Sequence, residues 1–175
     1  MNKTLEDILT RRSIRKYTDE MVSEDDLQTI INAGLYAASG SGRQAAIMVA
    51  VQDPVVLEKL ERLNASVVGR DPDTVKNFYG AKTVIVVLAE KDSKTAVQDG
   101  SLIIGNLMLA AHALGLGSCW INRARETFET EEGKQILKDL GIEGEYIGVG
   151  NCIIGHIDGE YPTARERKEN RVFRV

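Results

Sequence analysis

The chain has 175 residues, 43% of them hydrophobic and 27% charged, which is the composition of a globular protein and excludes a disordered one. Its formal net charge of −4 argues against a protein that holds nucleic acid by bulk charge. The two cysteines, Cys119 and Cys152, are too few for a metal site or a disulfide scaffold and fit free thiols in a reducing compartment. We therefore expect one domain over residues 1–175, without a metal and without a nucleic-acid partner.

Neither a leader nor a membrane segment is expected. Residues 1–13 lack the apolar core of a secretory signal. The most apolar stretch, residues 102–116, is interrupted by Asn106 and His112 and is shorter than the roughly 20 residues of a membrane-spanning helix. The sequence therefore predicts a cytoplasmic protein that does not bind a membrane.

The amino-terminal part predicts three helices and one strand. Thr4–Leu9 has the spacing of a short helix. Ser23 stands before a run of acidic residues, which is a helix start because the serine oxygen accepts from free N–H groups there and acids favour that end. Ile47–Val51 is predicted as a strand. Asp53-Pro54 opens a further helix, since proline fits the first helical position.

The rest of the chain continues this alternation after an irregular segment at residues 64–80. Thr83–Leu88 is a continuous β-branched run, typical of a strand buried on both faces. Residues 95–114 are apolar nearly all round, so they predict a helix inside the protein, with Gly115 ending it. The remaining expected elements are a strand at 118–121, a helix at 130–140 and a strand at 146–157.

Strands that alternate with helices favour the α/β or α+β class, with a central sheet covered by helices. The chain then ends in Val172-Phe173-Arg174-Val175, an apolar segment with no obvious place in its own core. Such a terminus is expected to lie across a partner subunit.

Positive charges are concentrated directly after the first helix, at Arg11, Arg12, Arg15 and Lys16, with Ser13 between them. Arginine binds phosphate or carboxylate with two parallel hydrogen bonds, and a serine hydroxyl adds a donor. The cluster therefore suggests an anion clamp, although a solvated basic turn has the same pattern.

A second basic cluster near the carboxyl end contains Arg165, Arg167, Lys168 and Arg171. A solvated tail explains it as well as a binding role does. Two such clusters in an acidic chain could converge on one dianion, although sequence spacing does not establish that they meet.

Small residues dominate the segment from Ser39 through Gly40 and Gly42 to Gln44, between a helix and a strand. Small side chains let a ligand approach the backbone closely, and Gln44 offers a donor and an acceptor. The segment is neither a Walker loop nor a dinucleotide fingerprint, and a plain flexible loop remains the alternative.

No set of side chains resembles a nucleophile or an acid–base pair. Cys119 is better explained as a buried structural thiol, and His112 and His156 as structural histidines. The known hydrolase and metalloprotease signatures do not occur. A chain with ligand-binding parts and no such set suits an enzyme whose cofactor performs the chemistry.

The order of these motifs along nearly the whole chain resembles the FMN-dependent nitroreductase family. The matching stretches are Arg11–Arg15, Ser39–Gln44, Asn106–Ile121 and the Arg165/Arg167 tail, of which Asn106–Ile121 is the most specific. The resemblance implies an α+β fold, with a helix-flanked mixed β-sheet, that forms a homodimer with two flavin sites at its interface.

The resemblance also implies a role for each matching position. Arg11, Arg12 and Ser13 are expected at the phosphate and ribityl chain of FMN, and Arg15 is expected at the pyrimidine edge. The partner subunit is expected to contribute Ser39, Gly40, Gly42 and Gln44, and the backbone of Trp120, Ile121 and Asn122 is expected along the N5 edge. Arg165 and Arg167 are expected at the phosphate.

The chain departs from the family pattern in the small-residue loop. Gly42 stands where the family usually has asparagine, and Ala45 and Ala46 stand where it has proline and tryptophan. These changes remove a side-chain contact to the flavin and loosen the space behind the ring.

The resulting prediction is an FMN-dependent oxidoreductase that passes hydride from NADH or NADPH through flavin N5 to an electron-poor small molecule such as a nitroaromatic or quinone. A flavin-binding storage or regulatory protein without turnover is the alternative that the loosened loop suggests. Related flavoenzyme chemistry, such as reductive dehalogenation, is a third possibility.

Overall fold

Four strands form one sheet in the computed structural model, which describes residues 2–175. The sheet order is β1-β2-β4-β3. The strands are β1 (Ala46–Val51), β2 (Thr83–Glu90), β3 (Gly117–Ile121) and β4 (Tyr146–Gly155). Each predicted strand is therefore present, and the observed ends differ by a few residues from those expected, as is common at strand ends.

All neighbouring strands are antiparallel, so the prediction of a mixed sheet is wrong for this chain. The reason is the insertion of β4 between β2 and β3. Because both pair with β4 in antiparallel fashion, β2 and β3 run in the same direction but are not neighbours. The class is accordingly α+β.

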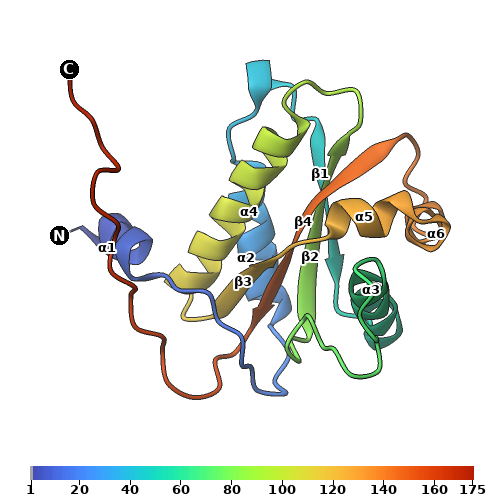
Figure 1. Cartoon of the computed structure of the whole chain (residues 1–175), viewed down its shortest axis with the longest axis horizontal. Coiled ribbons are helices and arrows are strands. Elements are labelled where there is room, and N and C mark those ends of the chain that lie inside the picture. Colours follow the sequence, from blue (N-terminus) through green and yellow to red (C-terminus); the bar gives the residue numbers. More distant parts are fainter. Residues whose placement is uncertain (1) are drawn as a thin grey trace.

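Helices cover both faces of the sheet (Figure 1). On one face lie α2 (Glu24–Leu35) and α4 (Ala96–Ala113). On the other lie α3 (Pro54–Ser66), α5 (Ala124–Glu129) and α6 (Glu131–Asp139). Strand β2 supplies side chains to both layers, since all its residues except the last are buried. The strand that the sequence predicted to be buried on both faces is thus confirmed.

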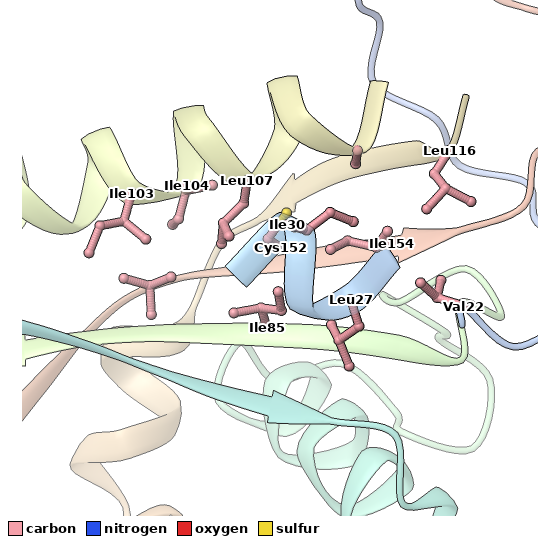
Figure 2. Packing of buried hydrophobic residues seen from close by; sticks show 12 residues of the cluster. Val22, Leu27, Ile30, Ile85, Ile103, Ile104, Leu107, Leu116, Cys152 and Ile154 are labelled. Carbon is pink, nitrogen blue, oxygen red and sulfur yellow. The ribbon is translucent and has the colours of Figure 1, made fainter. Parts of the chain in front are cut away.

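The layer under α4 contains the apolar cluster of Figure 2. Ile104 and Leu107 of α4 pack with Ile30 of α2 over Ile85 and Cys152 of the sheet, and all five side chains are fully buried. Burial of such side chains contributes about 1.5–3 kcal/mol each relative to full exposure. This layer therefore holds α4 firmly against β4, the strand that lies beside β3.

The starts of α2 and α3 and the end of α4 follow the predicted local signals. Ser23 Oγ accepts from Asp26 N–H at 3.1 Å. Asp53 Oδ1 accepts from the N–H groups of Val55 and Val56, with proline at the first helical turn. Gly115 follows α4 with a φ of 80°, a conformation that glycine adopts at no steric cost.

Helix α4 has the predicted bounds but is not buried all round, which corrects that expectation. Val97 and Leu102 are 49% and 50% exposed. In α1 (Lys3–Thr10), which was predicted only as a short helix, Leu5, Ile8 and Leu9 are more than half exposed as well. Apolar side chains of both helices therefore lie open in the single chain.

Two local expectations are also corrected. Residues 64–80 were expected to be irregular throughout, but α3 continues to Ser66. Helix α5 (Ala124–Glu129) was not predicted, because six residues are too few to show helical periodicity. It begins at Arg123, which has a φ of 77° and no side-chain cap. The chain therefore turns abruptly from β3 into α5.

Candidate functional site

A cleft of about 360 Å³ opens where β3 ends and α5 begins. It brings together Arg15 and the consecutive residues Trp120, Ile121 and Asn122, which are predicted site residues about 100 positions away from Arg15 in the sequence. The other lining residues come from α3, the segment after it and the start of α5: Asn64, Val68, Arg70, Asn77, Tyr79 and Arg123. The predicted roles of the four toward flavin stay predictions.

The basic segment reaches this cleft because it is fastened to β3. Ile14 is buried, and its N–H donates to Ser118 O at 3.0 Å. Ser13 forms an isolated parallel bridge with Ser118. The segment thus runs beside β3 without forming a further strand of the sheet, and Arg15 lines the cleft.

Arg11 and Arg12 have different surroundings. Within residues 2–175, the one hydrogen bond of the Arg11 side chain is a weak one to Met108 Sδ at 4.0 Å, so its guanidinium remains available to an anion. Arg12 instead donates from Nη1 to Leu9 O and to Arg11 O, each at 2.8 Å. A cation at free carbonyls stabilises the end of α1. Arg12 Nε is buried without a hydrogen-bond partner in the part of the chain that the structure describes, so one donor there is unused.

A small polar network ties the carboxyl-terminal tail to this segment. Tyr161 Oη accepts from Arg12 N–H at 2.9 Å and lies 3.2 Å from both Thr10 O and His112 Nδ1. His112 Nε2 lies 2.9 Å from Thr10 Oγ1. Burial lowers the pKa of His112, with the nearby charges of Lys3, Arg11 and Arg12 acting in the same direction. The nearby charge of Asp7 acts in the opposite direction.

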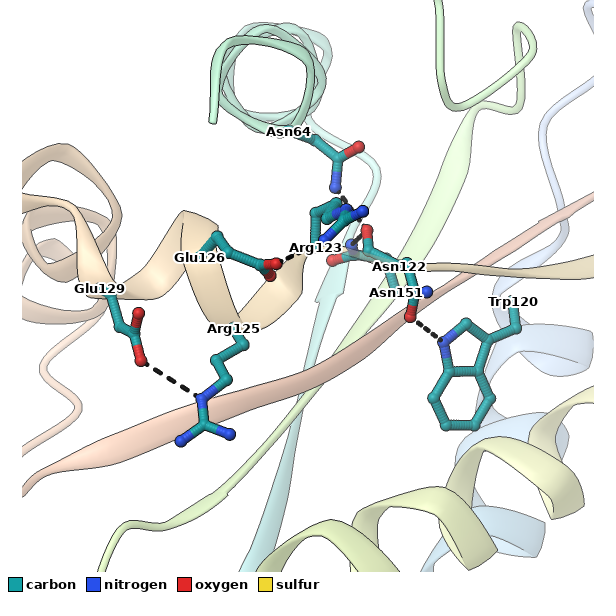
Figure 3. Close-up of polar contacts among 8 residues, drawn as sticks. All are labelled: Asn64, Trp120, Asn122, Arg123, Arg125, Glu126, Glu129 and Asn151. Atoms are coloured by element: carbon teal, nitrogen blue, oxygen red, sulfur yellow. Dashed lines mark hydrogen bonds and ion pairs between the residues drawn. The ribbon is translucent and has the colours of Figure 1, made fainter. Parts of the chain in front are cut away.

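Asparagine side chains fix the turn between β3 and α5 (Figure 3). Asn122 O accepts from Asn64 Nδ2 at 2.7 Å and from Asn151 Nδ2 at 3.4 Å. Asn77 Nδ2 donates to Asn64 Oδ1 at 2.9 Å. Because a trans peptide is planar, with its C=O and N–H on opposite sides, the N–H of Arg123 points away from Asn64 and Asn151. The backbone on this edge of the cleft is therefore preset.

The small-residue loop lies elsewhere in the chain, beside the start of α4 (Figure 1). Its centre is the 3₁₀ turn η1 (Gly40–Gly42). Asp99, a buried carboxylate, accepts from Gly40 N–H at 2.9 Å and from Thr95 Oγ1 at 3.0 Å. A side chain at Gly40 would collide with Thr95, so glycine is required there. Asp99 thus holds the loop rigidly, although none of its residues lines the cleft of the same chain.

The predicted carboxyl-terminal arginines also lie outside the cleft. Arg165 and Arg167 are exposed, and within residues 2–175 neither forms an ion pair or a hydrogen bond through its side chain. The tail runs past α1 and away from the sheet (Figure 1). Val172 and Phe173 remain 77% and 85% exposed, as the lack of a place in the core predicted.

The cysteines and the second histidine do not line the cleft. Cys119 and Cys152 are buried free thiols, and burial raises the pKa of Cys152. His156 lies 3.8 Å from Glu20, on the surface. In the described part of the chain, no group of three or more His, Cys, Asp or Glu side chains is placed to hold a metal ion, and no helix is long and apolar enough to span a membrane.

Two further hollows of about 390 Å³ each contain no predicted site residue. One lies at α6 and the start of β4, with Phe128, Leu137 and Ile142 in its lining. The other is a groove among α1, α2 and α4 that includes Tyr36 and Leu109. The cleft at the end of β3 is therefore the candidate site, even though it is smaller than some hollows, because predicted residues converge on it.

Comparison with known proteins places this geometry in a class of flavin-linked reductases. The Nitroreductase family matches residues 8–156, and the chain belongs to that family. It is 34% identical over 145 residues to an Archaeoglobus fulgidus protein with the provisional name NADH dehydrogenase/NAD(P)H nitroreductase, covering 80% of this chain and 76% of the other. It is 30% identical to the NADPH-flavin oxidoreductase of Vibrio harveyi, covering 95% of this chain and 70% of the other.

A solved structure supports the same assignment. A nitroreductase with bound FMN from Bacteroides fragilis superposes on this chain with a TM-score of 0.91, at 30% identity and with complete coverage of both chains. The α+β fold predicted from the family resemblance is thus confirmed, apart from the direction of its strands.

The residues of this chain fit a flavin phosphate and ring. Arg11 has a free guanidinium, Arg12 Nε is an unused buried donor, and Arg15 lines the cleft without an ion pair among residues 2–175. Donors of this kind match a dianionic phosphate and the electronegative edge of a ring.

Sequence reasoning missed six residues of the cleft: Asn64, Val68, Arg70, Asn77, Tyr79 and Arg123. Arg70 lies in the segment expected to be irregular, and Arg123 directly follows the predicted Trp120–Asn122 stretch. Arg123 could have been found by extending that stretch by one residue. Asn64 gave no signal, because its role depends on the approach of α3 to the β3–α5 turn.

Proposed function

We propose that the chain is an FMN-dependent oxidoreductase that takes hydride from NADH or NADPH and reduces an electron-poor small molecule such as a nitroaromatic or quinone. The observation that carries the proposal is the cleft at the end of β3, where Arg15 and the stretch Trp120–Asn122 meet. The related NADPH-flavin oxidoreductase and the FMN-bound nitroreductase support the choice of cofactor and donor.

In this proposal, Arg11 and Ser13 hold the FMN phosphate, and Arg15 lies toward the pyrimidine edge. Bound FMN supplies the atom that accepts and returns hydride. The chain positions the ring and stabilises negative charge on it, which Arg15 does by its fixed positive charge at the cleft. The preset backbone at Asn122 and Arg123 adds oriented dipoles that need no rearrangement.

We further infer that the site is completed in a homodimer. Two predicted parts, the loop at Ser39–Gln44 and the tail with Arg165 and Arg167, lie outside the cleft of their own chain. The open apolar faces of α1 and α4 and the exposed tail offer the surface that an obligate interface needs, commonly above about 2,000 Å². In the dimer, the partner's loop lines the flavin and the tail arginines approach a phosphate.

The two buried free thiols suit a reducing cytoplasm. The natural electron acceptor belongs to the class of small, electron-poor molecules.

The proposal is tested by purifying the protein, quantifying FMN against phosphorus, and measuring NADH and NADPH oxidation with a nitroaromatic and a quinone. Turnover that requires FMN supports an oxidoreductase. Stoichiometric FMN without turnover of any acceptor favours a flavin-storage or regulatory protein, the alternative suggested by Gly42, Ala45 and Ala46 in the loop.

A further inference from the structure

The cleft at the end of β3 is lined by three arginines and by no acidic side chain. Arg15 enters from the amino-terminal segment, Arg70 from the segment after α3, and Arg123 from the start of α5. The whole chain has a formal net charge of −4, so this local excess of positive charge runs against the composition. Three cations on different elements do not stabilise one another, because like charges repel at short range.

Neighbouring acids neutralise this charge only in part. Arg123 Nη1 donates to Glu126 Oε1 at 2.7 Å, which uses one of the five N–H groups of its guanidinium. Arg15 and Arg70 have no ion pair among residues 2–175. At least two positive charges therefore face the cleft without a partner.

No acid near Arg70 forms an ion pair with it among residues 2–175. Asp73 pairs with Arg62 at 2.6 Å, and Asp71 accepts from the N–H of Asp73 at 2.9 Å. Glu61 accepts from the N–H of Phe78 at 2.6 Å. These bonds shape the segment that carries Arg70 beside the cleft.

The backbone around the cleft is held in an uncommon conformation at two non-glycine residues. Tyr79 has a φ of 54° and Arg123 a φ of 77°. Side chains larger than glycine rarely adopt this region, and such residues gather at ligand sites. Both residues line the cleft, as does Trp120. The aromatic residue Tyr79 and guanidinium groups without an ion pair among residues 2–175 thus line the same small space.

We propose that the side of this cleft formed by Arg70 and Arg123 binds the electron acceptor. The acceptor is a planar aromatic anion, and Arg70 and Arg123 pair with its carboxylate or phosphate. The proposed function assigns Arg15 to the flavin. Arg70 and Arg123 are therefore the residues that determine which electron acceptor is bound. This inference rests on the proposed function. It narrows the acceptor class from electron-poor aromatics in general to those that bear an anionic group beside the ring.

The first test measures binding without turnover. FMN-loaded, oxidised protein is titrated with benzoate, phenyl phosphate and the neutral isostere benzamide, and the shift of the flavin absorption gives each dissociation constant. A charge-assisted hydrogen bond contributes about 1.5–3 kcal/mol, which corresponds to tenfold or more in affinity. We expect at least tenfold tighter binding of an anion than of benzamide, and the benzoate and phenyl phosphate arms distinguish a carboxylate from a phosphate ligand.

Substitutions test whether Arg70 and Arg123 cause the preference for an anion over benzamide. Arg70→Gln and Arg123→Gln should each reduce the anion-to-amide affinity ratio at least fivefold, whereas Arg70→Lys and Arg123→Lys should retain most of it. Arg125→Gln is the matched control, because Arg125 lies on the same helix but points away from the cleft and pairs with Glu129 (Figure 3). An anion-to-amide affinity ratio near one in the unmodified protein would overturn the proposal. So would a reduction of that ratio in Arg125→Gln as large as in the Arg70 and Arg123 variants.

The second test uses turnover. Protein reduced by dithionite, without NAD(P)H, is mixed with 4-nitrobenzoate or 4-nitrobenzamide, and flavin reoxidation is followed by stopped flow. We expect the anion to react with the higher second-order rate constant and the Gln variants to lose that preference. Failure of NAD(P)H to reduce the flavin would contradict the proposed function, while the benzoate titration would still decide the charge preference.

Discussion

Arg11 shows how a predicted ligand contact can be judged from what its side chain leaves unused. Its guanidinium has a sulfur contact at 4.0 Å and no carboxylate partner among residues 2–175, whereas the adjacent Arg12 is largely engaged with the end of α1. Of the two neighbours, Arg11 is therefore the better candidate for the phosphate, a distinction that the sequence alone did not make.

We predict that Arg11→Ala and Arg165→Ala weaken FMN binding far more than riboflavin binding. Each charged hydrogen bond removed should cost about 1.5–3 kcal/mol for FMN. Isothermal titration of the apoprotein with both ligands measures the difference. Lys16→Ala is the control, because Lys16 pairs with Asp158 at the surface. Equal losses for FMN and riboflavin would refute the phosphate contact.

The thiols and imidazoles lead to a prediction about the chemical step. Cys119 is buried, His156 lies at the surface near Glu20, and His112 is engaged in the Tyr161 network. Cys119→Ala, His112→Ala and His156→Ala should therefore each keep the rate of flavin reduction within about tenfold, equivalent to 1.4 kcal/mol. Stopped-flow reduction under nitrogen measures it. A variant that binds FMN normally but loses reduction by orders of magnitude would add a side chain to the mechanism.

At the scale of elements, local signals predicted those boundaries that depend on the chain itself. Ser23, Asp53-Pro54 and Gly115 each mark a helix end by a hydrogen bond or a backbone angle that their own chemistry favours. Local signals could not predict the direction of the strands, because that direction depends on the position of β4 between β2 and β3. Helix α5 was missed for a similar reason, since it is positioned by packing on β4 and not by its own pattern.

The contact between α5 and β4 predicts a sensitive position at Gly148. A Cβ there would collide with the backbone of Ala124 and lie 2.7 Å from Arg125 N. Gly148→Ala should lower the free energy of unfolding by about 1–3 kcal/mol, as overpacking commonly does. It should also weaken FMN binding, because α5 follows directly from the Asn122–Arg123 turn.

Urea denaturation and FMN titration measure these two effects. Gln135→Ala on the exposed surface of α6 is the control and should change stability by less than about 0.5 kcal/mol. Unchanged stability in Gly148→Ala would show that the β4–α5 contact is looser than described.

At the scale of the whole molecule, the site was predictable only in part from one chain. Arg15 and residues 120–122 line one cleft, but Arg11, Arg12, Ser13, the loop at 39–44 and the tail arginines do not line it. A sequence carries no direct signal of which copy of the chain supplies a residue. The open apolar side chains of α1 and α4 offer a surface for the second subunit that we propose.

We therefore predict an obligate homodimer. Light scattering in the micromolar range should give twice the chain mass of 19.2 kDa, and the mass should persist on dilution because apolar interfaces of this kind are large. Leu5→Glu and Leu102→Glu, each on an open apolar face, should dissociate the dimer and release FMN together. A 19.2 kDa species that retains stoichiometric FMN would contradict this arrangement.

The central claim is that this chain uses bound FMN to accept hydride from a nicotinamide donor. The most direct measurement is an anaerobic titration of the FMN-loaded protein with NADH and with NADPH, followed by the visible absorption of the flavin. The account predicts complete bleaching by one equivalent of at least one donor per FMN, and recovery of the colour on addition of a nitroaromatic or quinone. A protein that binds FMN stoichiometrically and stays yellow with an excess of both donors would contradict it.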